Sequence, residues 1–392
     1  MKKGWTYKKL GEVFKTYAGG TPSKANKANY INGTIPWLRS GEVCKKYITE
    51  SELYISEEGL RNSSAKYYPI NTVLIAMYGA TAAQCGILKF EATSNQAVCG
   101  VLPQKDFLPE FVYSYFVYIK DALAAQAQGG AQPNISQEKI KNVYFPCIPL
   151  SEQKLIVSRL DAAFSHIDEL KANAEKQLSE ARALFQKSLA KAMEPTEGWG
   201  ERKFKDLCSF VRGPFGGSLK KEMFVVSGYA VYEQQNAIYN RFNFRYFIDE
   251  EKYNSMIRFS VSPGDLIMSC SGTIGKVAII PDDAAQGIIN QALLKLTPKK
   301  ILDKYYLKYL MESSFFGDLI SQYSDWEAIK NIASVAILKD IVLPLPSLSE
   351  QQRIVERLDA LSAHVRDLEE NQKKIISECD ALKQALLRKV FE

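Results

Sequence analysis

The residue types that could do chemistry in this chain favour recognition over catalysis. Its only two histidines, His166 and His364, leave little material for a histidine metal site or a Ser-His-Asp triad. Seven cysteines lie far apart with no CxxC pair, so neither a zinc ribbon nor a disulfide framework is indicated. We therefore expect no catalytic, cofactor-binding or metal-binding residues, and we expect the protein in a reducing cytoplasm.

Polar loops in both halves of the chain carry side chains suited to nucleic acid. Arginine can pair bidentately with guanine, and asparagine or glutamine with adenine, while lysine and hydroxyl groups bind phosphate. The loops are GGTPSK and PWLRSGEV in the first half, and VRGPFGGSLKK and YEQQN in the second. The candidate DNA-binding residues in them are Thr21, Ser23, Lys24, Trp37, Arg39, Ser40, Arg212, Lys220, Lys221, Gln234, Gln235 and Asn236. Each alone is also an ordinary surface residue.

Motifs for an enzymatic reaction are missing. SGTIGK at residues 271–276 looks superficially like a phosphate-binding loop, but Cys270 and Val277 occupy places where such a loop needs Gly and Ser or Thr. We interpret it as a turn between two strands. The sequence has neither the Pro-Pro-aromatic tetrapeptide of a DNA methyltransferase nor a nuclease or helicase motif. Chemistry that follows binding is therefore expected on another chain.

Composition and charge fit a globular protein of two or three domains. Of its 392 residues, 46% are hydrophobic and 24% are charged. The basic N-terminus leads into no apolar run, and the longest uncharged run, residues 67–88, is broken by Pro, Asn and Gly, so neither a secretory signal nor a membrane span is expected. Residues 1–150 hold 17 Lys and Arg against 11 Asp and Glu, and residues 198–348 hold 18 against 16. If DNA is bound, the first globular domain contributes more to counterion release.

An internal repeat organises the chain. SEQKLIVSRLDAAFSHIDEL begins at Ser151 and SEQQRIVERLDALSAHVRDL at Ser349, with 11 of 20 positions identical. Weaker echoes lie upstream, such as Asn-Gln-Ala at residues 95–97 and 290–292. We therefore predict a tandem duplication: a globular domain at residues 1–150, a helix at 151–193, a second domain at 194–348 and a second helix at 349–392.

Each globular domain is predicted to be mixed α/β. Apolar strands at residues 72–77 and 265–268 precede glycine turns at Gly79 and Gly272, and helical patches follow at residues 109–127 and 303–322. In the two long helices, Ser151 and Ser349 are expected to cap the first turn. About 43 residues without Pro or Gly would make a rod of about 64 Å.

The apolar residues of both long helices follow a seven-residue repeat, which predicts a two-stranded coiled coil. Because the second helix starts where the first one ends, the pair must be antiparallel. This arrangement would place the domains at opposite ends of the rod, related by a pseudo-two-fold axis. The predicted seam residues are Ile156, Leu160, Ile167, Leu170, Leu184, Ile354, Leu358, Leu361, Val365, Leu368, Ile375, Leu382 and Leu386.

Taken together, these motifs resemble the DNA specificity (S) subunits of type I restriction-modification systems over essentially the whole chain. They are GGTPS at residues 19–23, PWLRSGEV at 36–43, the Gly-x-Thr turns, AQPNIS at 131–136, and the duplicated helix openings. The second domain departs from the pattern, with WEAIKNIA at residues 326–333 in place of AQPNIS and PFGGSLKK in place of GGTPS. Differing domains indicate an asymmetric target.

The resemblance implies a non-catalytic subunit whose two target recognition domains each read half of a bipartite double-stranded DNA sequence. It also implies two methyltransferase (M) subunits carrying S-adenosylmethionine and bound by the helices, and restriction/translocase (R) subunits that use ATP and Mg. The alternative is a coiled-coil adaptor that holds protein partners without reading DNA. Shortening both helices equally would change the gap between half-sites only if the rod sets that distance.

Overall fold

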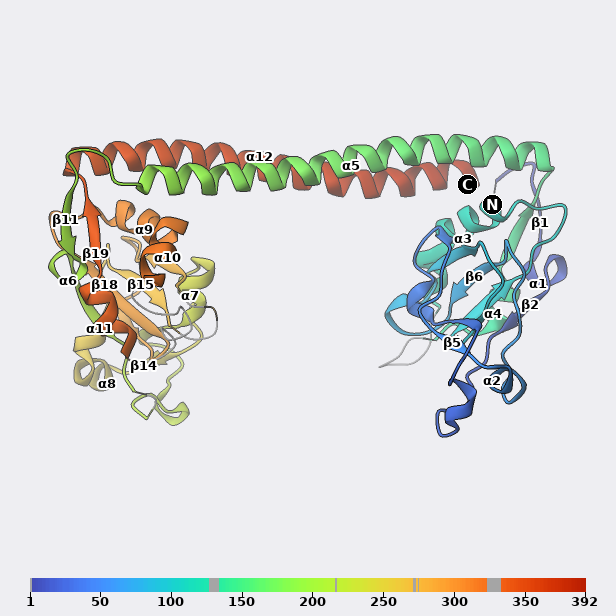
Figure 1. Ribbon diagram of the computed structural model, residues 1–392, viewed down its shortest axis with the longest axis horizontal. Helices are drawn as coiled ribbons and strands as arrows, with labels where there is room; N and C mark the ends of the chain where they lie inside the picture. The colour runs from blue at the N-terminus through green and yellow to red at the C-terminus, as the bar shows by residue number, and fades with distance from the viewer. Residues whose placement is uncertain (1, 127–133, 216, 271–272, 274, 323–332) are drawn as a thin grey trace. The chain divides into compact units, whose positions relative to one another are not determined.

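The computed structural model describes residues 2–126, 134–215, 217–270, 273, 275–322 and 333–392 (Figure 1). The chain forms two compact units: unit 1 comprises Met1–Glu175 with Lys373–Glu392, and unit 2 comprises Lys176–Gln372. Each unit joins one globular domain to parts of both long helices. No helix in the described part of the chain has the length and apolar character to cross a membrane.

Unit 1 contains domain 1, built on a five-stranded sheet, a three-stranded sheet and a two-stranded ribbon. Its elements are β1 Thr6–Lys9, α1 Leu10–Val13, β2 Thr16–Ala18, β3 Ile35–Leu38, β4 Tyr47–Ile48, β5 Tyr54–Ile55, α2 Glu57–Arg61, β6 Val73–Ala76, β7 Cys85–Leu88, β8 Thr93–Ser94, β9 Val98–Val101, α3 Pro109–Ala124, α4 Gln137–Lys141 and β10 Tyr144–Cys147. The strand orders are β2-β9-β6-β7-β4, β5-β3-β8 and β1-β10.

Unit 2 contains domain 2, whose described residues repeat this plan with no counterpart of β4. Its elements are β11 Gly200–Lys203, α6 Phe204–Leu207, β12 Cys208–Arg212, β13 Tyr229–Tyr232, α7 Gln234–Tyr239, β14 Phe247–Ile248, α8 Glu250–Ser255, β15 Leu266–Ser269, β16 Val277–Ile279, β17 Gly287–Ile289, β18 Leu293–Pro298, α9 Lys304–Glu312, α10 Ser314–Ser321, α11 Ala333–Asp340 and β19 Val342–Leu345. The strand orders are β12-β18-β15-β16, β14-β13-β17 and β11-β19. The predicted mixed α/β fold and tandem duplication are confirmed.

The central strand β6 shows why the predicted strand is apolar throughout. Val73 and Ile75 pack into the core that contains α3, while Leu74 and Ala76 pack into a second core with Leu38. A strand covered on both faces has no polar side. In domain 2, β15 is likewise fully buried and pairs antiparallel with β16, so SGTIGK lies between two strands, as predicted. Gly272, one of the predicted turn glycines, lies outside the described residues.

The two long helices are α5 Leu150–Met193 and α12 Leu348–Phe391. Both begin one residue earlier than predicted, so Ser151 and Ser349 lie inside the first turn and do not cap it. In α12 the Ser347 hydroxyl accepts the Glu350 N–H at 3.3 Å instead. The predicted helix at residues 303–322 is in fact two, α9 and α10, separated at Ser313, whose hydroxyl accepts the Phe316 N–H.

One buried glutamine fixes the start of each long helix to its own domain. Gln153 accepts the Leu108 N–H at 2.9 Å and donates to the carbonyls of Asp106 and Ile148 at 2.9 and 2.8 Å. Its repeat counterpart, Gln351, makes the same three bonds to Asp303, Ile301 and Pro346, at 2.7, 3.0 and 3.0 Å. The Gln of the repeated Ser-Glu-Gln motif therefore has a structural role.

The far end of each helix closes a core as well. Phe391 of α12 packs against Trp5, Phe111 and Tyr115 in unit 1, with ring centroids 5.2 to 6.1 Å apart. Met193 of α5, its repeat counterpart, is fully buried in the core of unit 2. Each domain core is thus completed by the start of one long helix and the end of the other.

Within each unit the long helices pair antiparallel, as predicted. In unit 1, Asp168 pairs with Lys383, and Lys171 with Asp380 at 2.8 Å, so numbers rise along one helix as they fall along the other. In unit 2, Arg182 reaches Glu369 at 2.7 Å, and Gln372 donates to Gln177 at 3.0 Å. Ile156, Leu160, Ile167, Ile354 and Leu358 are buried, and Leu361, Val365, Leu368 and Leu386 are half-buried.

Four predicted seam residues are exposed outside the seam. Leu170, Leu184, Ile375 and Leu382 are 56%, 58%, 38% and 48% exposed. The reason is register: from Leu160 the seam advances first by four residues, to Phe164, and then by three, to Ile167. The predicted residues that follow Ile156 and Ile354 in steps of seven, the half-buried Leu361 and Leu368 included, therefore lie one position to the side, on the flank of the seam.

Candidate nucleic-acid interface

The GGTPSK loop of domain 1 is tied down at its two glycines. Gly19 N–H and Gly20 N–H donate to the carbonyls of Val98 and Ser94 at 3.0 and 2.9 Å. A Cβ on Gly19 would stand 2.3 Å from the Ser94 carbonyl oxygen, which is why only glycine fits there. The Trp37 indole N–H donates to the Gly20 carbonyl at 2.9 Å. The two motifs that the sequence singled out in domain 1 are therefore packed together.

A cationic cavity lies where these motifs meet. Its volume is about 420 Å³, and it is lined by Lys24, Lys27, Tyr30, Ile31, Trp37, Arg39 and Leu53. Three of the predicted residues, Lys24, Trp37 and Arg39, are thus brought to one place, and Lys27 and Tyr30 are additions that the sequence analysis missed. Trp37 is only 5% exposed, so its indole forms part of the cavity wall and is not presented for a direct base contact.

The other predicted residues of domain 1 are close in sequence to residues that line this cavity. Thr21 is exposed, and its hydroxyl bonds the side chain of Gln96 in the repeated Asn-Gln-Ala turn. Ser23 and Lys24 are exposed, and Ser40 is half-buried in the 3-10 helix Ser40–Glu42. Hydroxyl and ammonium groups in this setting suit phosphate oxygens.

Arg39 occupies the point where β3 ends. Its guanidinium Nη2 meets Glu52 Oε2 at 2.6 Å, and its backbone N–H donates to Glu42 Oε2 at 2.7 Å. Glu42 also accepts the Glu52 N–H at 2.9 Å, so this carboxylate fixes both residues of the ion pair. The Arg39 side chain is 49% exposed. It is held in place and still open to a ligand.

The predicted residues of domain 2 divide into supporting and exposed groups. Asn236 is wrong as a base contact: it is 1% exposed, accepts the Glu233 N–H at 2.7 Å and donates to the Arg241 carbonyl at 2.6 Å. Arg212 donates to the Leu293 carbonyl at 2.7 Å and is half-buried. Lys220 and Lys221 are exposed, and Gln234 and Gln235 are half-buried at the start of α7.

Arg245 is the residue of domain 2 that the sequence analysis missed. Its Nε and Nη2 bond Glu233 Oε2 and Oε1 at 3.0 and 2.9 Å, a bidentate pair, and its side chain is 62% exposed. Hydrogen bonding to the Glu233 carboxylate raises the pKa of Arg245 above its ordinary value. The alternation of Arg and aromatic residues in RFNFRYF, residues 241–247, was the available signal.

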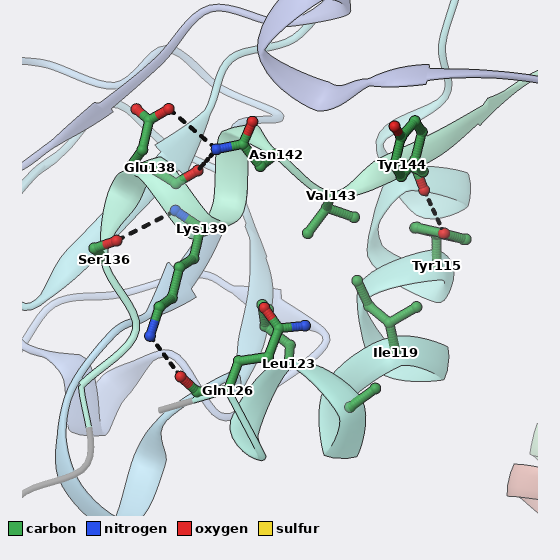
Figure 2. Close-up of a pocket in the computed structure, with 11 residues that line it drawn as sticks. Tyr115, Ile119, Leu123, Gln126, Ser136, Glu138, Lys139, Asn142, Val143 and Tyr144 are labelled. Atoms are coloured by element: carbon green, nitrogen blue, oxygen red, sulfur yellow. Dashed lines mark hydrogen bonds between the residues drawn. The ribbon is translucent and has the colours of Figure 1, made fainter. Parts of the chain in front are cut away.

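A second hollow of domain 1, of about 550 Å³, lies between α3 and α4 (Figure 2). Its polar groups bind neighbouring protein atoms: Tyr115 donates to the Tyr144 carbonyl, and Lys139 to the Gln126 carbonyl, both at 2.5 Å. Ser136, the last residue of AQPNIS, caps α4 here. Of that motif only residues 134–136 are described, and of WEAIKNIA only Ala333 is. The Tyr115 bond joins α3 to β10, and the Lys139 bond joins α4 to the residues that follow α3.

The chain matches the family described as the type I restriction modification DNA specificity domain twice, at residues 2–180 and 196–378. It belongs to this family. It is 22% identical to the StySPI specificity subunit of Salmonella potsdam, in an alignment covering all of this chain and 89% of that one. It is 33% identical to the EcoR124I/EcoR124II specificity subunit of Escherichia coli over 40% of each chain, so that alignment spans less than half of the relative.

Two solved structures share the fold of this type I specificity chain. One, from work on complex assembly and conformational transition of the type I restriction-modification system, superposes with a TM-score of 0.80 at 19% identity, covering 100% of this chain and 98% of that one. The other is the HsdS subunit from Thermoanaerobacter tengcongensis, with a TM-score of 0.58 at 18% identity and coverage of 100% and 97%.

Proposed function

We propose that this chain is the DNA-reading subunit of a type I restriction-modification complex, in which each globular domain reads one half of an asymmetric bipartite target. The observation that carries the proposal is that each domain presents an exposed arginine held by a glutamate. Arg39 and Arg245 lie beside the corresponding three-stranded sheets of the two domains, β5-β3-β8 and β14-β13-β17. Arginine is the commonest reader of guanine in the major groove. The different loops around the two arginines fit different half-sites.

The flanks of the paired helices support the binding of partner subunits. In unit 1 the repeat positions of Ala163, Leu170, Ile375 and Leu382 lie on one flank, and in unit 2 the corresponding positions are Leu361, Leu368, Gln177 and Leu184. In an antiparallel pair, equivalent flank positions of both helices share a side. We call these the unit 1 stripe and the unit 2 stripe. The unit 1 stripe is apolar throughout, and the unit 2 stripe is apolar except for Gln177, so each could join a larger apolar contact with a partner.

The opposite flank faces the globular domain of the same unit. Asp161 there binds Lys46 of domain 1 at 2.5 Å, and its repeat counterpart Asp359 accepts the Tyr309 hydroxyl of domain 2 at 2.5 Å. The apolar stripes are consequently turned away from their own domains. One equivalent stripe in each unit fits two copies of one partner, and we assign them to two methyltransferase subunits.

In this proposal the chain itself is not catalytic. S-adenosylmethionine belongs to the methyltransferase subunits, and ATP and Mg belong to restriction subunits that join the complex for cleavage. The protein acts inside the cell, where the DNA is. Because the +6 formal charge is modest, we expect binding to DNA by the isolated chain to be weak and salt-sensitive.

The test is to express this chain with the methyltransferase encoded beside it and to map methylated adenines over the host genome by single-molecule sequencing. The proposal expects a bipartite motif with a fixed gap, absent when this chain is omitted. A stable and active methyltransferase complex that yields no such motif would contradict it and favour the adaptor alternative.

A further inference from the structure

The two exposed ion pairs occupy the same place in the duplicated fold. In domain 1, Trp37 of β3 donates its backbone N–H to Leu53, and in domain 2, Val231 of β13 donates to Tyr246. Both strands pair antiparallel with a short strand later in the chain, β5 or β14, and parallel with β8 or β17. Residue 37 thus corresponds to residue 231, and residue 53 to residue 246.

This correspondence shows that the ion pair is reversed in charge. Arg39 stands two residues after Trp37 in domain 1, and Glu233 stands two residues after Val231 in domain 2. Glu52 stands one residue before Leu53 in domain 1, and Arg245 stands one residue before Tyr246 in domain 2. Both pairs close at hydrogen-bond distance, 2.6 Å in domain 1 and 2.9 to 3.0 Å in domain 2. The same bridge is therefore built with its two ends exchanged.

The support beneath the bridge is the same in both domains. Glu42 in domain 1 stands three residues after Arg39, and Asn236 in domain 2 stands three residues after Glu233. Each side chain accepts the backbone N–H of that earlier residue at 2.7 Å. Each also bonds the backbone of the facing loop, at Glu52 or Arg241. Both supports are little exposed, so the strand end is fixed in each domain, although Glu42 is a carboxylate and Asn236 is a neutral amide.

We infer that the two bridges are corresponding base-reading elements, in each of which the arginine contacts a guanine of its half-site and the glutamate positions the guanidinium. This inference rests on the proposed function. A guanidinium has five N–H donors, of which Glu233 takes two in Arg245 and Glu52 takes one in Arg39. The edge formed by the remaining Nη N–H groups can meet guanine O6 and N7. Exchanging the ends of the bridge moves that edge from the end of β3 to the loop before β14, so the two domains read different positions.

The surroundings of the two arginines differ in a way that reinforces this. In domain 1 Leu53 lines the cationic cavity with Tyr30 and Arg39. In domain 2 the residue corresponding to Leu53 is Tyr246, which stacks on Phe224 with centroids 4.5 Å apart, and Phe224 corresponds to Tyr30. The Arg245 guanidinium carbon lies 5.5 Å from the Tyr246 ring centroid. Domain 1 thus offers its arginine beside a cavity, and domain 2 offers its arginine beside an aromatic stack.

The experiment uses the complex of the full chain with its methyltransferase subunits and measures methylation at every variant of the motif. The variants are Arg39→Ala, Arg39→Lys, Arg245→Ala and Arg245→Lys, with Glu52→Gln and Glu233→Gln for the positioning role. Arg61→Ala and Arg258→Ala, at exposed arginines of domains 1 and 2, are matched controls. Assembly of each complex is checked by size-exclusion chromatography before methylation is scored.

The inference expects loss of discrimination at one G·C pair, by about ten- to a hundredfold, confined to one half of the motif for Arg39 and to the other half for Arg245. Lysine should not restore it, because lysine lacks the planar fork. The Glu→Gln variants should reduce the same discrimination by a smaller factor. The double exchange Arg39→Glu with Glu52→Arg should shift the recognised position and leave assembly intact.

Two results would overturn the inference while leaving the proposed function standing. One is a uniform fall in methylation over all sequences, which is the signature of a phosphate contact. The other is an unchanged motif in assembled Arg39→Ala and Arg245→Ala complexes. Failure of the proposed function is distinguishable, because the unaltered chain would then yield no bipartite motif at all.

Discussion

Gln153 in unit 1 and Gln351 in unit 2 are both fully buried and make the same three backbone hydrogen bonds, whereas Arg39 and Glu233, at corresponding strand ends, have opposite charges. The matched residues are those whose polar atoms are satisfied only by the fold itself. The unmatched residues form ion pairs with side chains of the facing loop, and the arginines of these pairs, Arg39 and Arg245, are 49% and 62% exposed. After a duplication, side chains that hold the framework stay alike, and those that meet a ligand can diverge.

The helix ends give the largest test of this equivalence. Phe391→Ala removes a ring packed against four aromatic side chains and should lower the free energy of unfolding of unit 1 by about 3–5 kcal/mol. Met193→Ala should cost about 2–5 kcal/mol in unit 2. Hydrogen exchange in α3 and α9 reports the two units separately. Loss of protection in the wrong unit would refute the assignment of these helix ends.

The buried glutamines come next. Gln153→Leu and Gln351→Leu leave buried backbone groups without partners, and each should cost about 2–3 kcal/mol. The two costs should agree, because the bonds match in number and partner type. Thermal unfolding followed by circular dichroism measures them, with the exposed Gln352→Leu as control. A large difference between the two variants would show that the hydrogen bonds of Gln153 and Gln351 are not equivalent in energy.

The apolar stripes should affect partner binding and not the fold. Leu170→Ser with Leu382→Ser changes the unit 1 stripe, and Leu184→Ser with Leu368→Ser changes the unit 2 stripe. Each pair should weaken one methyltransferase contact by about ten- to a hundredfold, because each leucine is already partly buried in the chain and burying the rest contributes only about 0.8–1.5 kcal/mol per side chain. Native mass spectrometry should then find one methyltransferase subunit per chain. The exposed Ala172→Ser, on the flank of α5 opposite the stripe, is the control, and two retained subunits would refute the assignment.

The duplication and the two long helices could be predicted because both depend on patterns within short stretches of sequence. The repeat at Ser151 and Ser349 gave the duplication, and the absence of Pro and Gly after it gave both helices to within a residue. The seam was predicted less well, because Leu170 and Leu382 are as apolar as true seam residues. Only the partner helix decides whether an apolar residue lies in the seam or beside it.

The candidate site was predicted in part for a similar reason. Arg39 and Lys24 belong to motifs, which is why the sequence predicted them as candidates. Arg245 lies in no motif, and its place beside Glu233 depends on a pairing between β13 and β14 that the sequence does not reveal. Asn236 and Trp37 have the right chemical types but are buried, and burial depends on the tertiary fold. Residue type predicted the chemistry of the surface, and strand register determined which residues form it.

The smallest effect concerns a buried polar residue of the seam whose counterpart is apolar. Gln372 in unit 2 is 7% exposed and donates to Gln177, while its repeat counterpart in unit 1 is the buried Ala174. A polar residue at a seam position fixes register at a cost in stability. Gln372→Leu should therefore stabilise the paired helices of unit 2 by about 1 kcal/mol, since water can satisfy the exposed Gln177 amide. Slower hydrogen exchange in residues 361–372 would show this, with Gln177→Ala as control, whereas faster exchange would mean that the amide pair itself holds the helices together.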